Sequence, residues 1–261
     1  MQLFVVEASV VADSRRGPRA RWLAACAAGA LLAFGPAAGA EDVPAPEVDL
    51  RPDPAGSPPG SIPEFTDVSF GSVAVTTAGF LTAFVVHEAC HGVANLAMGN
   101  VPTLEPVRFL GFLPFFAVSP GITCNQGTCF RRNGAPFPPG PRGYAVIVSA
   151  GLICQEVTNE IILTTRPGLR YEKAPFLKGM LLFNTAASVA YGIANLAGIE
   201  PPEGDLRALD SVSPLPRGVF AAAVLGTAAL DVARYFLPDS QWLPWVSRGT
   251  KVVTIGMVVA F

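Results

Sequence analysis

The chain has 261 residues, of which 51% are apolar and only 15% are charged, whereas a soluble domain usually carries about 25% charged residues. With a net charge of −2, it offers no basic surface of the kind that binds nucleic acid. The apolar residues gather in stretches close to the roughly 20 residues that a helix needs to cross a bilayer. We therefore predict an integral, multi-pass membrane protein surrounded by the lipid bilayer, and expect it in the inner membrane of a bacterium.

The N-terminal part of the chain has the layout of an export signal. Residues 1–40 contain the cationic run RRGPRARW, the short apolar core LAACAAGALLAF and the small-residue stretch GPAAGA. This order is typical of a signal peptide, or of an anchor that is not cleaved. Residues 41–71 are rich in proline and acidic residues, a composition that predicts a disordered linker. The membrane-embedded domain is then residues 72–261.

The membrane domain divides into apolar stretches and one broken region. The stretches long enough to span a bilayer are residues 72–98, 144–165, 174–198 and 218–237. The last apolar run, residues 252–261, has about half the length of a span. Residues 101–142 mix prolines and glycines with short apolar pieces, which suits a re-entrant or interfacial loop. The predicted fold is all-α, a bundle of about four to five transmembrane helices with this loop region packed against it.

Both histidines of the chain fall inside the first predicted span. They occur in the sequence HEACH, with His87 and His91 four residues apart and Glu88 beside the first. Positions i and i+4 share one face of a helix, so both imidazoles can bind one zinc ion while the glutamate takes a proton from a water. The alternative is a pair of structural histidines. Because these three side chains cost several kcal/mol inside a membrane, we favour a catalytic zinc site.

The third zinc ligand is less clear from the sequence. A catalytic zinc normally has three protein ligands, and no histidine remains to supply the third. One candidate is Asp205, which follows the third predicted span; the others are Glu156 and Glu160, four residues apart on the second span. If the linker lies outside the cell, counting spans places the HEACH motif and Asp205 at the same, cytoplasmic, membrane face. This count favours Asp205, and the two glutamates remain the alternative.

Two motifs together resemble the site-2 protease family of intramembrane zinc metalloproteases. The first is HEACH in an apolar helix. The second begins near the end of the third predicted span, with Asn195 and Leu196, and continues after it with Pro201, Pro202 and Asp205. The family's second motif ends in Leu-Asp-Gly, whereas this chain has Gly204-Asp205-Leu206. The resemblance covers roughly residues 72–205, and no insert of the size of a PDZ domain interrupts them.

The resemblance implies a function and a role for each site residue. The protein would be a zinc endopeptidase that cuts a peptide bond in or near a transmembrane segment of another membrane protein, which would be its partner. His87, His91 and Asp205 would bind the zinc, and Glu88 would be the general base. Asn195 would help to hold the substrate.

Two other functions compete with this one. The first is a gluzincin-like arrangement, in which a glutamate of the second span is the third ligand. The second is a non-catalytic membrane protein, either an inactive protease homologue or a transporter, with a structural metal site. Since a site that only holds a metal has no need of a base, the presence of Glu88 argues against the latter. A di-iron membrane oxidase is excluded, because it needs many more than two histidines.

Four of the five cysteines lie in the predicted membrane domain. Cys124 and Cys129 are close enough in sequence to form a disulfide, but the expected topology puts them on the reducing side of the membrane. That pairing remains open. We expect Cys90, inside the HEACH motif, and Cys154, on the second span, to pack as small apolar residues.

Overall fold

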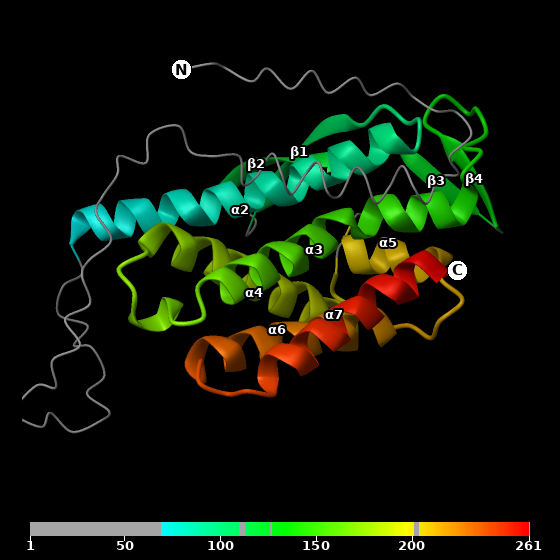
Figure 1. Ribbon diagram of the computed structural model, residues 1–261. Coiled ribbons are helices and arrows are strands. Elements are labelled where there is room, and N and C mark those ends of the chain that lie inside the picture. Colours follow the sequence, from blue (N-terminus) through cyan, green and yellow to red (C-terminus); the bar gives the residue numbers. More distant parts are fainter. Residues whose placement is uncertain (1–68, 110–112, 126, 201–203, 261) are drawn as a thin grey trace, which may run out of the picture.

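A computed structural model describes residues 69–109, 113–125, 127–200 and 204–260 (Figure 1). The signal peptide or anchor predicted for residues 1–40 lies outside these residues, as does nearly all of the linker predicted for 41–71. The described residues form six α-helices, a short 3-10 helix (Leu169–Tyr171) and four short strands. The fold is mostly helical, as the composition predicts.

Four helices are long and apolar enough to cross a membrane, and they coincide with the four predicted spans. They are α2 (Phe70–Ala97), α3 (Gly140–Thr165), α4 (Pro175–Ala197) and α6 (Val219–Phe236). This result supports a multi-pass membrane protein. Two further helices were not predicted, α5 (Asp205–Val212) and α7 (Leu243–Ala260). The sequence analysis assigned no helix to the first and only a half-length apolar run to part of the second.

Helix α3 lies at the centre of the bundle and α2 lies at its edge. In the most apolar 18-residue window of α3, 83% of the residues are buried, against 17% in α2. Helices α2, α4, α5, α6 and α7 all contact α3 (Figure 1). Helix α2 packs against α3 and α4 and exposes apolar side chains such as Val75, Leu81 and Val85. Such an exposed apolar face is what a lipid-facing helix requires.

Two glycines allow α2 and α4 to pack closely. A β-carbon on Gly79 of α2 would lie 2.0 Å from the backbone oxygen of Phe176, and one on Gly179 of α4 would lie 2.0 Å from that of Thr76. Neither position has room for a side chain. Small residues of this kind bring helix backbones together in membrane proteins, where packing replaces the hydrophobic effect as the driving force.

The broken region 101–142 contains two antiparallel hairpins that the sequence analysis did not predict. Strand β1 (Thr103–Phe109) pairs with β2 (Leu113–Ser119), and β3 (Ile122–Asn125) pairs with β4 (Thr128–Arg131). Figure 1 shows β3–β4 at the end of the bundle where α2 ends and α3 begins, whereas β1–β2 runs back alongside α2, which β2 contacts. The scattered prolines and short strand lengths hide the alternating pattern that normally identifies strands.

Both pairs of cysteines in the described residues form disulfides. Cys124 and Cys129 face each other across the β3–β4 hairpin, with their Cα atoms 4.0 Å apart. Cys90 of α2 is bonded to Cys154 of α3, with their Cα atoms 6.5 Å apart. The expectation that Cys90 and Cys154 pack as free thiols is therefore wrong. It failed because a pairing between two helices depends on how they cross, which the local sequence does not reveal.

Candidate metal centre

The structure brings His87, His91 and Asp205 together in one group. The histidines lie on successive turns of α2, and Asp205 is the first residue of α5. The carboxylate oxygen Oδ2 of Asp205 lies 3.2 Å from Nε2 of His87 and 3.3 Å from Nε2 of His91. The two Nε2 atoms are 3.2 Å apart. The three atoms thus form a nearly equilateral triangle, and these residues could hold a metal ion.

The size of this triangle fits a tetrahedral zinc ion. Zinc binds imidazole nitrogen and carboxylate oxygen at about 2.0–2.1 Å, and ligands at that distance lie about 3.3–3.4 Å from one another around a tetrahedral ion. The measured separations of 3.2–3.3 Å agree with this geometry. Three protein ligands leave a fourth position for water or substrate, as in catalytic zinc sites.

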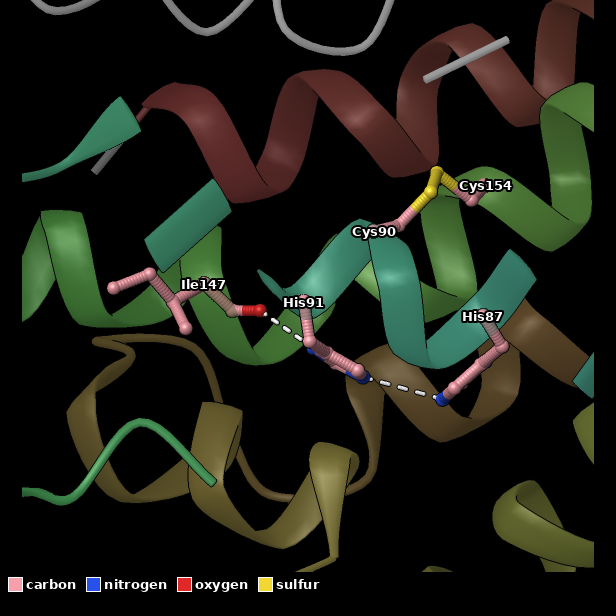
Figure 2. Close-up of a disulfide and its surroundings, with 5 residues drawn as sticks. All are labelled: His87, Cys90, His91, Ile147 and Cys154. Carbon is pink, nitrogen blue, oxygen red and sulfur yellow. Dashed lines mark hydrogen bonds between the residues drawn. A yellow bond between two sulfur atoms is a disulfide. The ribbon is translucent and has the colours of Figure 1, made fainter. Parts of the chain in front are cut away.

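The hydrogen bonds of His91 leave its Nε2 atom available for a metal. Its Nδ1 atom lies 2.8 Å from the backbone oxygen of Ile147 on α3 (Figure 2). Because a carbonyl oxygen can only accept, Nδ1 carries the proton, and Nε2 of the neutral ring presents its lone pair. Metal-binding histidines usually make such a bond with the other ring nitrogen, which fixes the tautomer and the orientation of the ring.

The ring of His87 is held by stacking rather than by a hydrogen bond. It lies parallel to the ring of Tyr191 on α4, with an interplanar angle of 4° and centroids 6.2 Å apart. Its Nδ1 atom is buried and has no hydrogen-bond partner within the described part of the chain. Both histidines are almost fully buried, at 3% and 5% exposure. The two imidazoles are therefore fixed by different elements, α3 for His91 and α4 for His87.

The carboxylate of Asp205 is charged and lacks an ordinary hydrogen bond at the atom that faces the histidines. Its side chain is 14% exposed, and Oδ2 accepts no hydrogen bond from the described residues. Burial tends to raise the pKa of Asp205, but its interactions with the two imidazoles outweigh burial and hold the pKa well below its ordinary value. A buried, ionised oxygen of this kind is a suitable metal ligand.

Gly151 of α3 provides the space in which the ligand nitrogens lie. A β-carbon at this position would be 2.4 Å from Nε2 of His87 and also 2.4 Å from Nε2 of His91. Any larger residue would displace at least one imidazole. The sequence offers no local sign of this requirement, because it follows from the packing of α3 against α2.

Glu88 lies beside the group but is not part of it. Its Oε2 atom accepts a hydrogen bond from the backbone N–H of Val118, at 2.7 Å. Val118 belongs to β2, so this bond joins the HEACH helix to the first hairpin. Glu88 is partly exposed, whereas its two histidine neighbours are buried. A carboxylate that is near the metal ligands but free of them can act as a general base.

The alternative ligands lie elsewhere. Glu156 accepts a hydrogen bond from the Thr227 hydroxyl, at 2.9 Å, and Glu160 pairs with Arg234 of α6. The structure thus groups Asp205 with the histidines and leaves both glutamates out. Asn195 is 1% exposed, and its amide donates to acidic side chains within the chain. Its role in holding a substrate stays a prediction.

Comparison of the chain with protein-family models, with curated proteins and with solved structures finds no match. The function is therefore inferred from the residues of the metal centre and from the helices that carry them. The observations with most weight are the spacing of the three ligand atoms and the place of Glu88 next to them.

Proposed function

We propose that the protein is an intramembrane zinc metalloendopeptidase that hydrolyses a peptide bond in or near a transmembrane segment of another membrane protein. The observation that carries the proposal is the triangle of His87, His91 and Asp205 ligand atoms, at tetrahedral spacing. The two histidines lie on a helix long and apolar enough to cross a membrane. Buried ionisable groups in such helices are usually functional. The resemblance to site-2 proteases rests on the same residues.

The chain's own residues would divide the chemistry among them. A bound zinc ion would supply a Lewis acid that polarises the substrate carbonyl and lowers the pKa of a water toward 7. His87, His91 and Asp205 would hold the ion. Glu88 would accept the proton from the attacking water and pass it to the leaving nitrogen, as a general base and then a general acid. Its bond to Val118 keeps the carboxylate close to the ligands.

The β1–β2 hairpin supports a peptide as the substrate. One edge of strand β2 pairs with β1. The backbone N–H of Val118 lies on the other edge and donates a hydrogen bond to Glu88. Since alternate residues of an antiparallel strand direct their backbone groups to the same side, this edge of β2, which pairs with no strand among the described residues, faces Glu88. An extended peptide can bind such an edge as an added strand. Its backbone would then run past Glu88.

The experiment that tests the proposal separates metal binding from cleavage. A single-span membrane protein is co-expressed with the wild type, with Glu88→Gln or with His87→Ala, and cleavage and zinc content are both measured. Glu88→Gln should keep its zinc and slow cleavage by about 10²–10⁴-fold, because the proton acceptor is lost. His87→Ala should lose zinc and activity together. If Glu88→Gln cleaves as fast as the wild type, the proposed hydrolase function is wrong. The alternative, a membrane protein with a structural metal site, would then take its place.

A further inference from the structure

A second buried carboxylate lies just before the helix that carries Asp205. Helix α4 ends at Ala197, followed by Gly198 in the left-handed conformation, and α5 begins at Asp205. Glu200 lies in this connection and is only 2% exposed. A buried carboxylate is costly unless it is well hydrogen-bonded, so the contacts of Glu200 indicate what it does.

Both carboxylate oxygens of Glu200 are engaged. Oε1 accepts a hydrogen bond from the backbone N–H of Leu206, at 3.1 Å, and Oε2 accepts one from the amide of Asn195, at 2.8 Å. Leu206 is the second residue of α5, where backbone N–H groups have no partner within the helix. A carboxylate stabilises a helix end of this polarity. Glu200 therefore caps α5 and ties it to α4 through Asn195.

The surrounding residues are arranged to admit this carboxylate. A β-carbon on Gly204 would lie 2.4 Å from Oε1 of Glu200, so only glycine lets the carboxylate approach the start of α5. The backbone oxygen of Glu200 accepts a hydrogen bond from the Arg207 side chain, at 2.9 Å. The amide of Asn195 also donates to Asp210, near the other end of α5, at 3.0 Å. Helix α5 is thus held to the end of α4 at both of its ends.

We propose that Glu200 is a positioning residue that sets where Asp205 lies relative to His87 and His91. Asp205 directly precedes Leu206, the residue whose amide Glu200 binds, so the capping bond fixes the first turn of α5. This helix has only eight residues, and a helix so short is not stable on its own. The burial of Leu206 and Leu209 holds α5 against the bundle, but apolar packing is not directional. The orientation of its first residue depends on the cap.

The inference rests on the proposed metal centre and is tested on metal affinity. The full chain is purified in detergent, stripped of metal and titrated with zinc against a chelator, and the visible absorption of its cobalt form is recorded. Glu200→Ala should weaken zinc binding by about 10- to 100-fold, the usual effect of losing a residue that supports a ligand. The cobalt bands, which report the ligand geometry, should shift as well. Glu200→Gln retains an oxygen for the Leu206 amide and should restore most of the affinity.

Two further variants guard against a folding defect. Gly204→Ala keeps every polar group but places a methyl where Oε1 lies, so it should weaken zinc binding as Glu200→Ala does. Asp210→Ala removes the other partner of Asn195 and leaves the cap intact, so it should bind zinc as the wild type does. Thermal unfolding of each variant in detergent verifies that it is folded.

Each outcome bears on a different claim. Wild-type zinc affinity and cobalt spectrum in Glu200→Ala or in Gly204→Ala would overturn the positioning role. Equal losses in Glu200→Ala, Glu200→Gln and Asp210→Ala would also overturn it, since they would indicate general loosening of α5. If the wild type itself binds no zinc, the proposed function fails before this inference is reached.

Discussion

Two polar clusters lie against helix α3, and they differ in how their charges are balanced. One is the metal centre around Gly151. The other, the ion cluster, joins α3 to α6 and α7 through Glu160, Asp231, Arg234, Arg248 and Lys251. The amine of Lys251 lies 2.6 Å from Asp231 and 3.2 Å from Glu160. The guanidinium of Arg234 lies 2.5 Å from Glu160. In the ion cluster, each carboxylate faces a cation supplied by the chain.

The metal centre has the opposite character. Its three facing atoms, two imidazole nitrogens and a carboxylate oxygen, are all electron-pair donors, and they converge on one point. Such atoms attract one another only through a shared cation or proton. In this bundle, the polar cluster that neutralises itself joins helices, whereas the one whose donors converge could hold a metal ion. This agrees with the general finding that ionisable groups in membranes either pair or mark functional sites.

The largest expected effect is loss of the metal. Replacing His87, His91 or Asp205 by alanine should remove the roughly one zinc ion per chain that three ligands would hold, because two ligands bind zinc much more weakly. Zinc content of the purified protein, measured by elemental analysis, tests this. Glu160→Ala, in the ion cluster, is the matched control and should keep its zinc. Zinc lost from Glu160→Ala but kept in Asp205→Ala would restore the gluzincin arrangement.

The next largest effect should come from breaking the ion cluster. Lys251→Ala leaves Asp231 buried without its cation, and removing one partner of a buried pair typically costs about 3–5 kcal/mol. Chemical unfolding in detergent measures this loss, while zinc stoichiometry should stay unchanged. The double variant Asp231→Leu/Lys251→Leu should lose less stability than Lys251→Ala, since it no longer leaves a buried carboxylate at position 231 without its cation. A double variant that is less stable than Lys251→Ala would contradict this account.

A smaller effect is expected at Gly151. Alanine there would overlap Nε2 of both histidines, and overpacking by one methyl costs about 1–3 kcal/mol, or roughly 5- to 150-fold in zinc affinity. Gly92 is the control because it lies on α2 next to His91, where an added β-carbon meets nothing within 4 Å. Equal zinc affinity of Gly151→Ala and Gly92→Ala would show that the histidines do not lie against α3.

The smallest effect concerns the Cys124–Cys129 disulfide, whose removal should leave zinc affinity unchanged. The disulfide is informative because its redox state reports which side of the membrane this part of the protein faces. Both disulfides are at the metal end of the bundle, and disulfides persist in oxidising compartments, whereas counting spans from the export signal puts this end in the cytoplasm. Alkylation of free cysteines in cells quenched with acid decides between the two orientations. Cysteines that the reagent cannot modify, because they are in disulfides, would place the metal centre on the non-cytoplasmic side. Cysteines that it modifies would support the span count.

The parts of the site that are local in sequence were predictable. HEACH sets its two histidines on one face because helix geometry alone does so, and the four spans follow from length and composition. Asp205 required an assumption about topology. The contributions of Ile147, Gly151 and Glu200 could not be predicted, because a backbone oxygen, a missing side chain and a loop carboxylate acquire their roles only when α3, α4 and α5 pack together.

The Cys90–Cys154 bond limits how the protein can move. It links the HEACH helix to α3 across 64 residues that include both hairpins, and Cys90 lies between the two histidines. The bond therefore prevents α2 and α3 from separating beside the two histidines. Any opening must come from α4 and α5, which hold Tyr191 and Asp205, or from the β1–β2 hairpin. If the protein is the proposed protease, the HEACH helix would be its fixed element, and Asp205 and the hairpin would belong to the parts left free to move.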